Sequence, residues 1–245
     1  MATPNHVLSA LAHELQRRQA VRAISEGHSS TGASALDQLL PNRGLKAGGL
    51  TEWLSHAAEG GLTFALLAAS QAMKSRAASV VAIIDPKRQV YPACLPGWGI
   101  PLERAVLIRP SSSADALWAW EQSLRCPGMA ACLGWLPETS SVALRRLQVA
   151  AEHGGGLGLL VRPARAMKEP SWADVRWRVM PVPIVSSNAR PDPLRGRRFR
   201  VELVRCRSHF GGGVADVEFC PHAANPVRLA PALADPAVAL RATGS

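Results

Sequence analysis

Apolar residues in this chain follow two alternating patterns, which predict strands joined by helices. Short continuous apolar runs predict buried strands at residues 50–54, 80–84, 105–108, 130–136 and 157–161. Apolar residues three and four apart predict helices at residues 62–73, from the serines at 111–113 to about 125, and at 140–153. After Trp172 come strands without helices between them, at about residues 175–181, 199–206 and 214–219. We therefore predict an α/β fold with a mostly parallel sheet flanked by helices and antiparallel strands at its C-terminal end.

The stretch at residues 49–69 has the order of strand, small-residue loop and helix in which P-loop proteins hold a nucleotide. That loop needs glycines whose N–H groups surround phosphates, a Lys for the β/γ oxygens and a Ser or Thr for Mg²⁺. The corresponding positions here carry Ser55, Gly60, Gly61 and Leu62. Because the Lys and the hydroxyl at the metal position are missing, we expect a nucleotide-binding architecture without its chemistry, and no bound cofactor.

Composition indicates an ordinary soluble chain. Its 245 residues fit one large domain. No apolar run approaches the roughly 18 to 20 residues that a membrane span needs, and His13 and Glu14 interrupt the stretch where a signal peptide would be apolar. The five cysteines are odd in number and form no C-x-x-C pair or Cys/His cluster. We therefore expect a cytoplasmic protein with no membrane partner, no metal site and free buried thiols.

Positive charge is concentrated in one part of the chain. The net charge is +10, and residues 157–212 contain twelve Arg or Lys against four Asp or Glu. The arginine-rich run at residues 190–207 is the best candidate surface for contact with DNA or a partner protein, through Arg195, Arg197, Arg198, Arg200, Arg205 and Arg207. A solvated basic edge strand that prevents sheet-to-sheet association explains the run equally well. Because Val201, Leu203 and Cys206 could not all share one face of a regular strand, we also expect a bulge or a partly covered strand there.

The two ends of the chain differ from its middle. Residues 6–23 have Val7, Leu8, Leu11 and Leu15 at helical spacing, which predicts an amphipathic helix. Small residues at 26–35 predict a linker, and the alanines and prolines after residue 221 predict a loosely ordered tail. The predicted organisation is an N-terminal helix and linker at 1–29, one domain at 30–220 and a tail at 221–245.

Three segments resemble the core of RecA-type recombinases. They are S-T-G-x3-L-D-x-L-L-P-x2-G-L-x2-G-G-L-T-E at 30–52, VAIIDPKRQVYP at 81–92 and GIPLERAVLIRP at 99–110. A small RecA-like chain that lacks the phosphate Lys and ends in a V-E-L-x-R-x-R strand, at 201–207, is most similar to the ImuA family. These are accessory proteins of the bacterial ImuA, ImuB and DnaE-type mutagenesis cassette, and the cell-division inhibitor SulA is related to them.

The resemblance implies that the catalytic positions of RecA are lost here. The phosphate Lys position falls on Gly61 and the Mg²⁺ hydroxyl position on Leu62, so the Walker A motif is degenerate. The catalytic Glu position falls on Lys87 and the Walker B Asp position near Trp135. Neither a Lys nor an indole can do the work of those carboxylates, so we expect no ATPase activity and no enzyme.

The resemblance also implies a function. A chain of this family would be a non-catalytic binding module in an error-prone polymerase assembly for SOS-induced translesion DNA synthesis and DNA repair. Its partners would be the ImuB-type Y-family polymerase homologue and, through it, the DnaE-type error-prone polymerase, with RecA and DNA as further candidates. Two alternatives remain open: a SulA-like cell-division inhibitor, and a weak ATPase or DNA-binding protein with a rebuilt site that uses Lys46 or Lys87.

Overall fold

The computed structural model describes residues 27–56, 60–136, 139–182, 197–208, 212–219 and 227–229. The helix predicted at residues 6–23 lies outside these ranges. Among the residues described, no helix is both long enough and apolar enough to cross a membrane.

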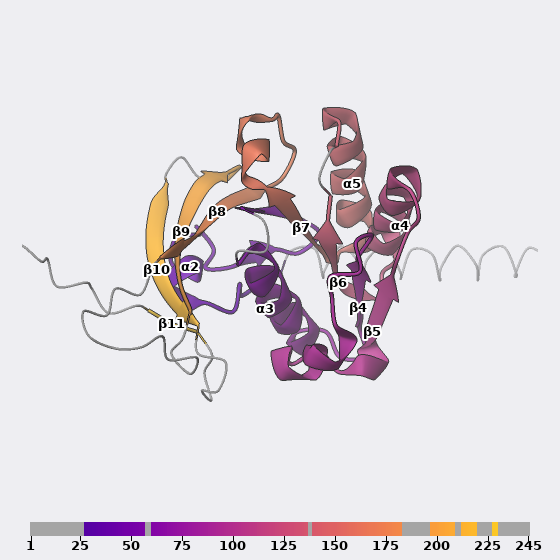
Figure 1. The fold of residues 1–245 in the computed structure, drawn as a ribbon, viewed down its shortest axis with the longest axis horizontal. Helices are drawn as coiled ribbons and strands as arrows, with labels where there is room; N and C mark the ends of the chain where they lie inside the picture. The colour runs from indigo at the N-terminus through magenta and orange to yellow at the C-terminus, as the bar shows by residue number, and fades with distance from the viewer. Residues whose placement is uncertain are drawn as a thin grey trace, which may run out of the picture.

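The described residues form one sheet of nine strands and a small sheet of two (Figure 1). The large sheet has the spatial order β11-β10-β9-β8-β3-β7-β6-β4-β5. Its strands in chain order are β3 (Leu50–Ser55), β4 (Val80–Ile84), β5 (Ala105–Ile108), β6 (Met129–Trp135), β7 (Leu157–Pro163), β8 (Val175–Val182), β9 (Arg197–Cys206), β10 (Gly213–Phe219) and β11 (Val227–Leu229). Pairing is parallel from β8 to β5 and antiparallel from β8 to β11. The predicted fold class is therefore confirmed.

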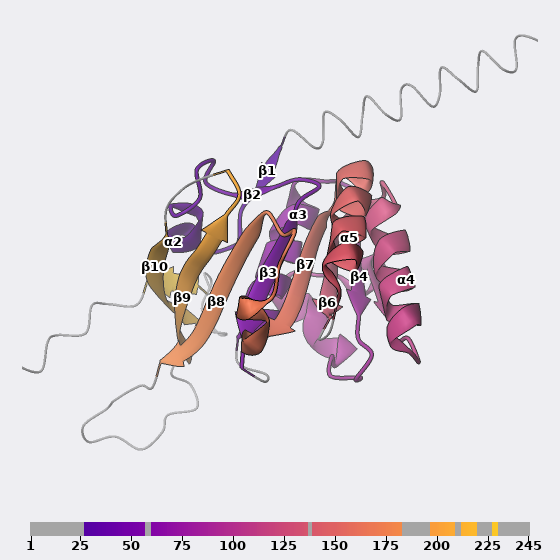
Figure 2. The same cartoon turned by 90° about the horizontal axis from the view of Figure 1, so that it is seen from above.

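Three helices cover the two faces of the parallel part of the sheet (Figure 2). Helix α3 (Gly61–Lys74) lies on one face, and α4 (Ser113–Arg125) and α5 (Ser141–Gly154) lie on the other. Ser112 caps α4 and Ser140 caps α5, and each side chain accepts a backbone N–H three residues on. Gly155 ends α5 with a left-handed φ of 74°.

A group of stacked aromatic rings joins α3 to the antiparallel end of the sheet. Trp53 of β3 stacks on Phe64 of α3 and on Trp177 of β8, with ring centroids 5.5 and 5.8 Å apart. Phe199 of β9 meets Phe64 edge-on at 5.7 Å. All four rings are buried, so α3 packs on β8 and β9 as well as on the parallel strands.

Residues 28–46 depart from the linker that small residues predicted at 26–35. They form β1 (His28–Ser29), α2 (Ser34–Asp37) and β2 (Leu45–Lys46), with β1 paired to β2. The Asp37 carboxylate accepts hydrogen bonds from the Ser30 hydroxyl and the Thr31 N–H, and Thr31 is fully buried. Small polar residues are thus used here for side-chain to backbone bonds within the folded domain, which composition alone does not reveal.

Short 3₁₀ turns lie in two of the connections between strands. They are η1 (Pro92–Trp98) and η2 (Leu102–Arg104) between β4 and β5, and η3 (Ala164–Lys168) between β7 and β8. Strand β11 falls in the region predicted as a loosely ordered tail.

The thiols are only partly as predicted. Cys132 and Cys206 are buried and free, and burial raises the pKa of the Cys132 thiol well above its ordinary value. Cys94 and Cys126 are free but exposed, so the prediction of buried thiols is wrong for these two. Cys94 lies in the 3₁₀ turn η1, and Cys126 ends α4, so both occupy connections rather than core positions.

Candidate functional site

The four residues at P-loop positions come together where β3 leads into α3. Ser55 is the last residue of β3, and Gly60 is the N-cap of α3, with a left-handed φ of 85°. Gly61 is so close to Ser55 that an added Cβ would lie 2.7 Å from the Ser55 Oγ. Leu62 follows in the first turn of the helix. The predicted strand, loop and helix are therefore present, with residues 57–59 of the loop outside the described part.

Apolar side chains occupy the space beside Gly60. A Cβ added there would lie 2.6 Å from the Phe199 ring and 2.8 Å from a methyl group of Val179. Both side chains are buried and come from β9 and β8. Among the described residues, the side chains at this place are an aromatic ring, an isopropyl group and Leu62, and none of them can donate a hydrogen bond to a phosphate.

The other residues that the RecA resemblance aligns with catalytic positions are Lys87, close to the buried Asp85, and Trp135. Asp85, directly after β4, is fully buried, and its two carboxylate oxygens accept the N–H groups of Gln89 and Val90 at 2.8 and 2.9 Å. Lys87 is exposed within the turn that this pairing closes. Trp135 is half-buried at the end of β6.

The lysines of a rebuilt phosphate site do not converge. Lys87 lines a cavity of about 630 Å³ with Trp135, Arg165 and the capping serines of α4 and α5, at the carboxyl ends of β4, β5 and β6. Lys46 lines a separate cavity of about 270 Å³ with His28, Asp174 and Arg207. The structure therefore places the two lysines at different sites.

Three arginines on the exposed face of the antiparallel strands are paired with carboxylates. Arg200 of β9 forms a two-pronged pair with Asp216 of β10, with N–O distances of 2.8 and 2.9 Å. Arg198 lies 3.6 Å from Glu218, and Arg178 of β8 lies 3.7 Å from Glu202. We call these three cross-strand pairs the outer ladder. Three positive and three negative groups balance in it, so two of the six candidate arginines, Arg198 and Arg200, lie in a locally neutral surface.

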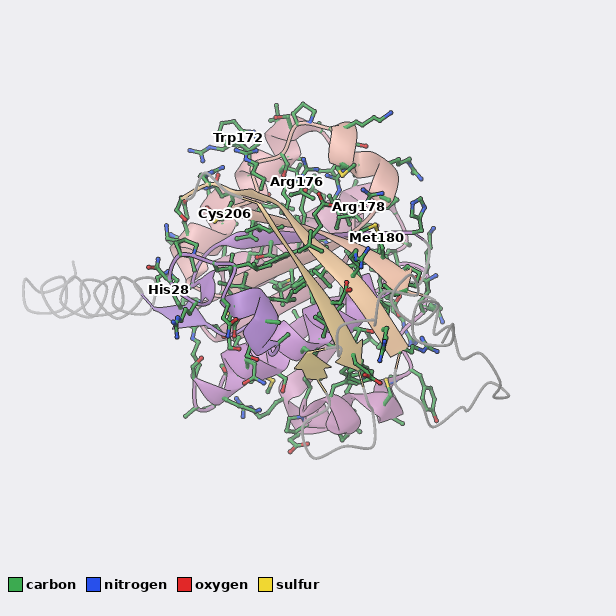
Figure 3. All side chains as sticks on the ribbon, turned by 90° about the vertical axis from the view of Figure 1, so that its left-hand side faces the viewer. His28, Trp172, Arg176, Arg178, Met180 and Cys206 are labelled. Atoms are coloured by element: carbon green, nitrogen blue, oxygen red, sulfur yellow. The ribbon has the colours of Figure 1, made fainter. Side chains whose placement is uncertain are left out.

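Figure 3 looks onto this end of the sheet and shows Arg176, Arg178 and Met180 following one another along β8. Within the ladder, the hydrogen bonds from Arg200 lower the pKa of the Asp216 carboxyl, and Asp216 in turn raises the pKa of Arg200.

Of the remaining candidate arginines, two donate hydrogen bonds to nearby carbonyl groups. Arg197 is exposed at the start of β9, and Arg195 lies outside the described residues. Arg205 donates to the Ser171 carbonyl at 3.0 Å, and Arg207 donates to the Trp172 carbonyl at 2.8 Å. These last two arginines tie the segment before β8 to the end of β9.

Strand β9 has the predicted bulge. Arg176 pairs with Arg205 and Trp177 pairs with Leu203, which leaves Val204 without a partner on β8. The bulge allows Leu203 and Cys206 to be buried on the same side. However, β9 lies between β8 and β10, so the alternative of an edge strand is wrong.

Sequence reasoning missed a buried group of charges on the α5 side of the sheet. Glu52 of β3 pairs with Arg162 of β7 at 2.9 Å and with Arg176 of β8 at 2.7 Å. Arg162 also pairs with Glu169, and the Arg176 guanidinium donates to the Ala166 carbonyl in η3. We call Glu52, Arg162, Arg176 and Glu169 the buried charge network. Single charged residues within apolar runs, as in L-T-E-W-L, V-R-P and V-R-W, were the signal that could have revealed it.

Fold and site together define an α/β domain with a mostly parallel sheet, in which the side chains of Phe199 and Val179 lie beside Gly60 at the start of α3. Protein ImuA of Caulobacter vibrioides is 31% identical over 231 residues, which cover 88% of this chain and 93% of that protein. The chain belongs to the ImuA family.

More partial similarity links the chain to a second group. The cell division inhibitor SulA of Photorhabdus laumondii is 33% identical over 93 residues, 38% of this chain and 52% of that protein. SulA of Edwardsiella piscicida is 33% identical over 78 residues, 32% of this chain and 44% of that protein. No family model matches the chain.

Proposed function

We propose that the chain is a non-catalytic accessory protein of SOS-induced translesion DNA synthesis, which acts as a binding module in a cytoplasmic error-prone polymerase assembly. Its partners are the ImuB-type Y-family polymerase homologue and, through it, the DnaE-type polymerase, with RecA and DNA as further candidates. The six arginines from Arg195 to Arg207 are the candidate contact surface that the sequence supplies.

The observation that carries this proposal is the extent of the similarity to ImuA. The match covers 88% of this chain and 93% of the relative, so it includes both the parallel sheet and the antiparallel end. The SulA matches cover 32% and 38% of this chain. A function that depends on the whole domain is therefore better supported by the ImuA relative.

The packing at the P-loop positions supports a non-catalytic role. Phe199 and Val179 lie against Gly60, where the phosphates of a nucleotide would need polar groups. Lys87 stands where a RecA protein has its catalytic carboxylate, and the nearby Asp85 is already bonded to two backbone N–H groups. We therefore expect the domain to act by binding other macromolecules.

The test is co-elution of the purified chain with the ImuB-type protein and RecA of the same genome, each alone and together. We expect a stable complex with the ImuB-type protein, and ATP turnover with Mg²⁺ no faster than buffer. A chain that elutes alone from both would overturn the accessory role. Turnover that depends on Mg²⁺ and disappears in Lys87→Ala would overturn the non-catalytic role.

A second arm of the same experiment addresses division inhibition, which the SulA matches favour. The chain is mixed with the tubulin-like division protein and the inhibition of its polymerisation is followed. We expect none. Inhibition together with filamentous cells on overproduction, and an unchanged mutation rate, would replace the accessory role with a SulA-like one.

A further inference from the structure

The outer edge of β10 is paired over only part of its length. Val217, Glu218 and Phe219 pair with β11, whereas residues 213–216 have no strand partner on that side within the part of the chain that the structure describes. Unpaired N–H and C=O groups at a sheet edge can accept another extended chain. The pairing of β11 with this edge shows that it already takes an antiparallel strand.

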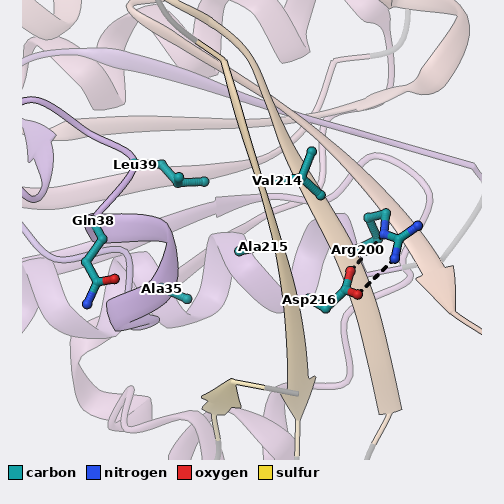
Figure 4. Close-up of a pocket in the computed structure, with 7 residues that line it drawn as sticks. All are labelled: Ala35, Gln38, Leu39, Arg200, Val214, Ala215 and Asp216. Atoms are coloured by element: carbon teal, nitrogen blue, oxygen red, sulfur yellow. Dashed lines mark hydrogen bonds and ion pairs between the residues drawn. The ribbon is translucent and has the colours of Figure 1, made fainter. Parts of the chain in front are cut away.

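A groove of about 460 Å³ surrounds this unpaired edge. Figure 4 shows its lining, with Ala35 of α2, Gln38 and Leu39 on one side of β10 and Val214 on the other. Ala35 and Ala215 are buried, Leu39 is half-buried, and Val214 is 57% exposed. The groove therefore offers aliphatic surface on both sides of a backbone edge that has no strand partner among the described residues.

The edge lacks the usual features that prevent strand addition. Residues 213–216 read Gly-Val-Ala-Asp, with no Pro or Lys. The pairing with β9 runs through all four residues without a bulge. The carboxylate of Asp216 is bound to Arg200, so its charge does not stand alone at the edge. Nothing in these four residues repels an incoming strand.

We infer that residues 213–216 of β10 and the adjoining groove bind an extended segment of a partner protein by strand addition. The segment's backbone continues the sheet, its small or aliphatic side chains lie against Ala35, Leu39 and Val214, and its polar groups meet the Arg200–Asp216 pair. The site is four residues long, ends at β11 and is flanked by α2, which suits a slender peptide. A second copy of the chain would need to bury about 800 Å² per partner for a stable interface, which is more than an edge of four residues offers.

This inference rests on the proposed function, because the partner is the one that the polymerase assembly supplies. Hydrogen exchange of the full chain is measured with and without the ImuB-type protein as the probe. Because alternate residues of β10 already bond to β9, we expect the outward-facing amides among residues 213–216 to exchange at least about tenfold more slowly in the complex, since strand pairing protects them. Amides in α5, on a remote surface, are the internal reference.

Two matched variants complete the test. Val214→Lys places a charge at the edge and should weaken the complex about tenfold. Val142→Lys changes a valine on α5 that is 71% exposed, and should leave the affinity unchanged. A wild-type complex with unchanged exchange at 213–216 and full affinity in Val214→Lys overturns the strand-addition site and leaves the proposed function standing. Absence of any wild-type complex overturns the proposed function, and the inference with it. Self-association that Val214→Lys abolishes would assign the edge to a second copy and overturn a partner segment.

Discussion

Arg176 and Arg178 lie two positions apart on β8, on the same face of the sheet, and their surroundings differ. Arg176 belongs to the buried charge network, where its partner Glu52 is fully buried and η3 supplies carbonyl acceptors. Arg178 belongs to the outer ladder, where it and Glu202 are each more than a third exposed. Among the described residues, η3 covers Arg176, whereas no element covers Arg178 on the same sheet face.

The buried charge network therefore affects the stability of the fold, and the outer ladder affects the charge of the surface. Removing charges from water is costly, so the buried charge network is stable only because two carboxylates and two guanidinium groups balance and bond to one another. It also links β3, β7 and β8, whose register it favours. Exposed pairs such as those of the outer ladder contribute little to stability, but they set the charge that an approaching molecule meets.

The strongest way to separate the two regions is to remove one charge from each. Glu52→Gln leaves Arg162 and Arg176 without their shared carboxylate in a buried site, so we expect a loss of about 3–5 kcal/mol in the free energy of unfolding. Glu202→Gln makes the same change in the outer ladder and should cost less than about 1 kcal/mol. Urea unfolding of both variants measures the difference. Equal losses of unfolding free energy in the two variants would show that the cover by η3 does not make the buried pairs more important for stability than the exposed ones.

Replacing three of the four members of the buried charge network by apolar residues sharpens the comparison. In Glu52→Leu/Arg162→Met/Arg176→Met no charge remains unpaired among these three positions, and Glu169, with its side chain 38% exposed, can turn toward water. We expect this variant to regain most of the stability lost in Glu52→Gln, since well-packed apolar groups often replace a buried ion pair at no cost. Recovery should be incomplete, because the Leu136 carbonyl loses its bond from Arg162. A triple variant less stable than Glu52→Gln would contradict this account.

Most of the fold could be predicted from the sequence, because its signals are local. Continuous apolar runs gave the five strands from β3 to β7, and Ser112 and Ser140 marked where α4 and α5 begin. The spacing of Leu203 and Cys206 indicated a bulge or a partly covered strand, and β9 has the bulge. These features depend on neighbouring residues, so one sequence contains them.

The candidate site was harder to predict, because its properties depend on residues far apart in the chain. The neutrality of Arg198 and Arg200 requires the register of β10, which places Glu218 and Asp216 beside them. The packing of Phe199 against Gly60 joins residues 139 positions apart. In the sequence, Glu52 is a single charged residue in an apolar strand. Only the pairing of β3 with β7 and β8 places Arg162 and Arg176 beside it. Such pairings follow from topology rather than from local pattern.

The charge balance of the outer ladder can be broken without touching an arginine. Glu202→Gln/Asp216→Asn/Glu218→Gln leaves three cations on one sheet face, so we expect tighter binding of single-stranded DNA at low salt. The slope of log affinity against log salt should steepen by about 2 if three phosphates are met. The control is the serine variant at Arg195, Arg197, Arg198 and Arg200, which should weaken retention of DNA or of the ImuB-type partner. Fluorescence anisotropy with salt titration measures both, and unchanged behaviour of both variants would remove this face as a contact surface.

The smallest expected effect concerns one carboxyl of the outer ladder. Hydrogen bonds from Arg200 lower the pKa of Asp216 below its ordinary value, so Arg200→Ser should raise that pKa, as a carboxyl-detected NMR titration would show. A carboxyl whose pKa is lower in the folded state adds stability above its unfolded-state pKa, and this contribution disappears as the pH falls through the folded-state pKa. Because Arg200 and Asp216 are 49% and 35% exposed, we expect no measurable change in the urea midpoint at pH 7. Arg178→Ser is the matched control, since Arg178 pairs with Glu202 and should leave the pKa of Asp216 unchanged. If the Asp216 pKa moved equally in both variants, the ladder would act through its overall charge rather than through individual cross-strand pairs.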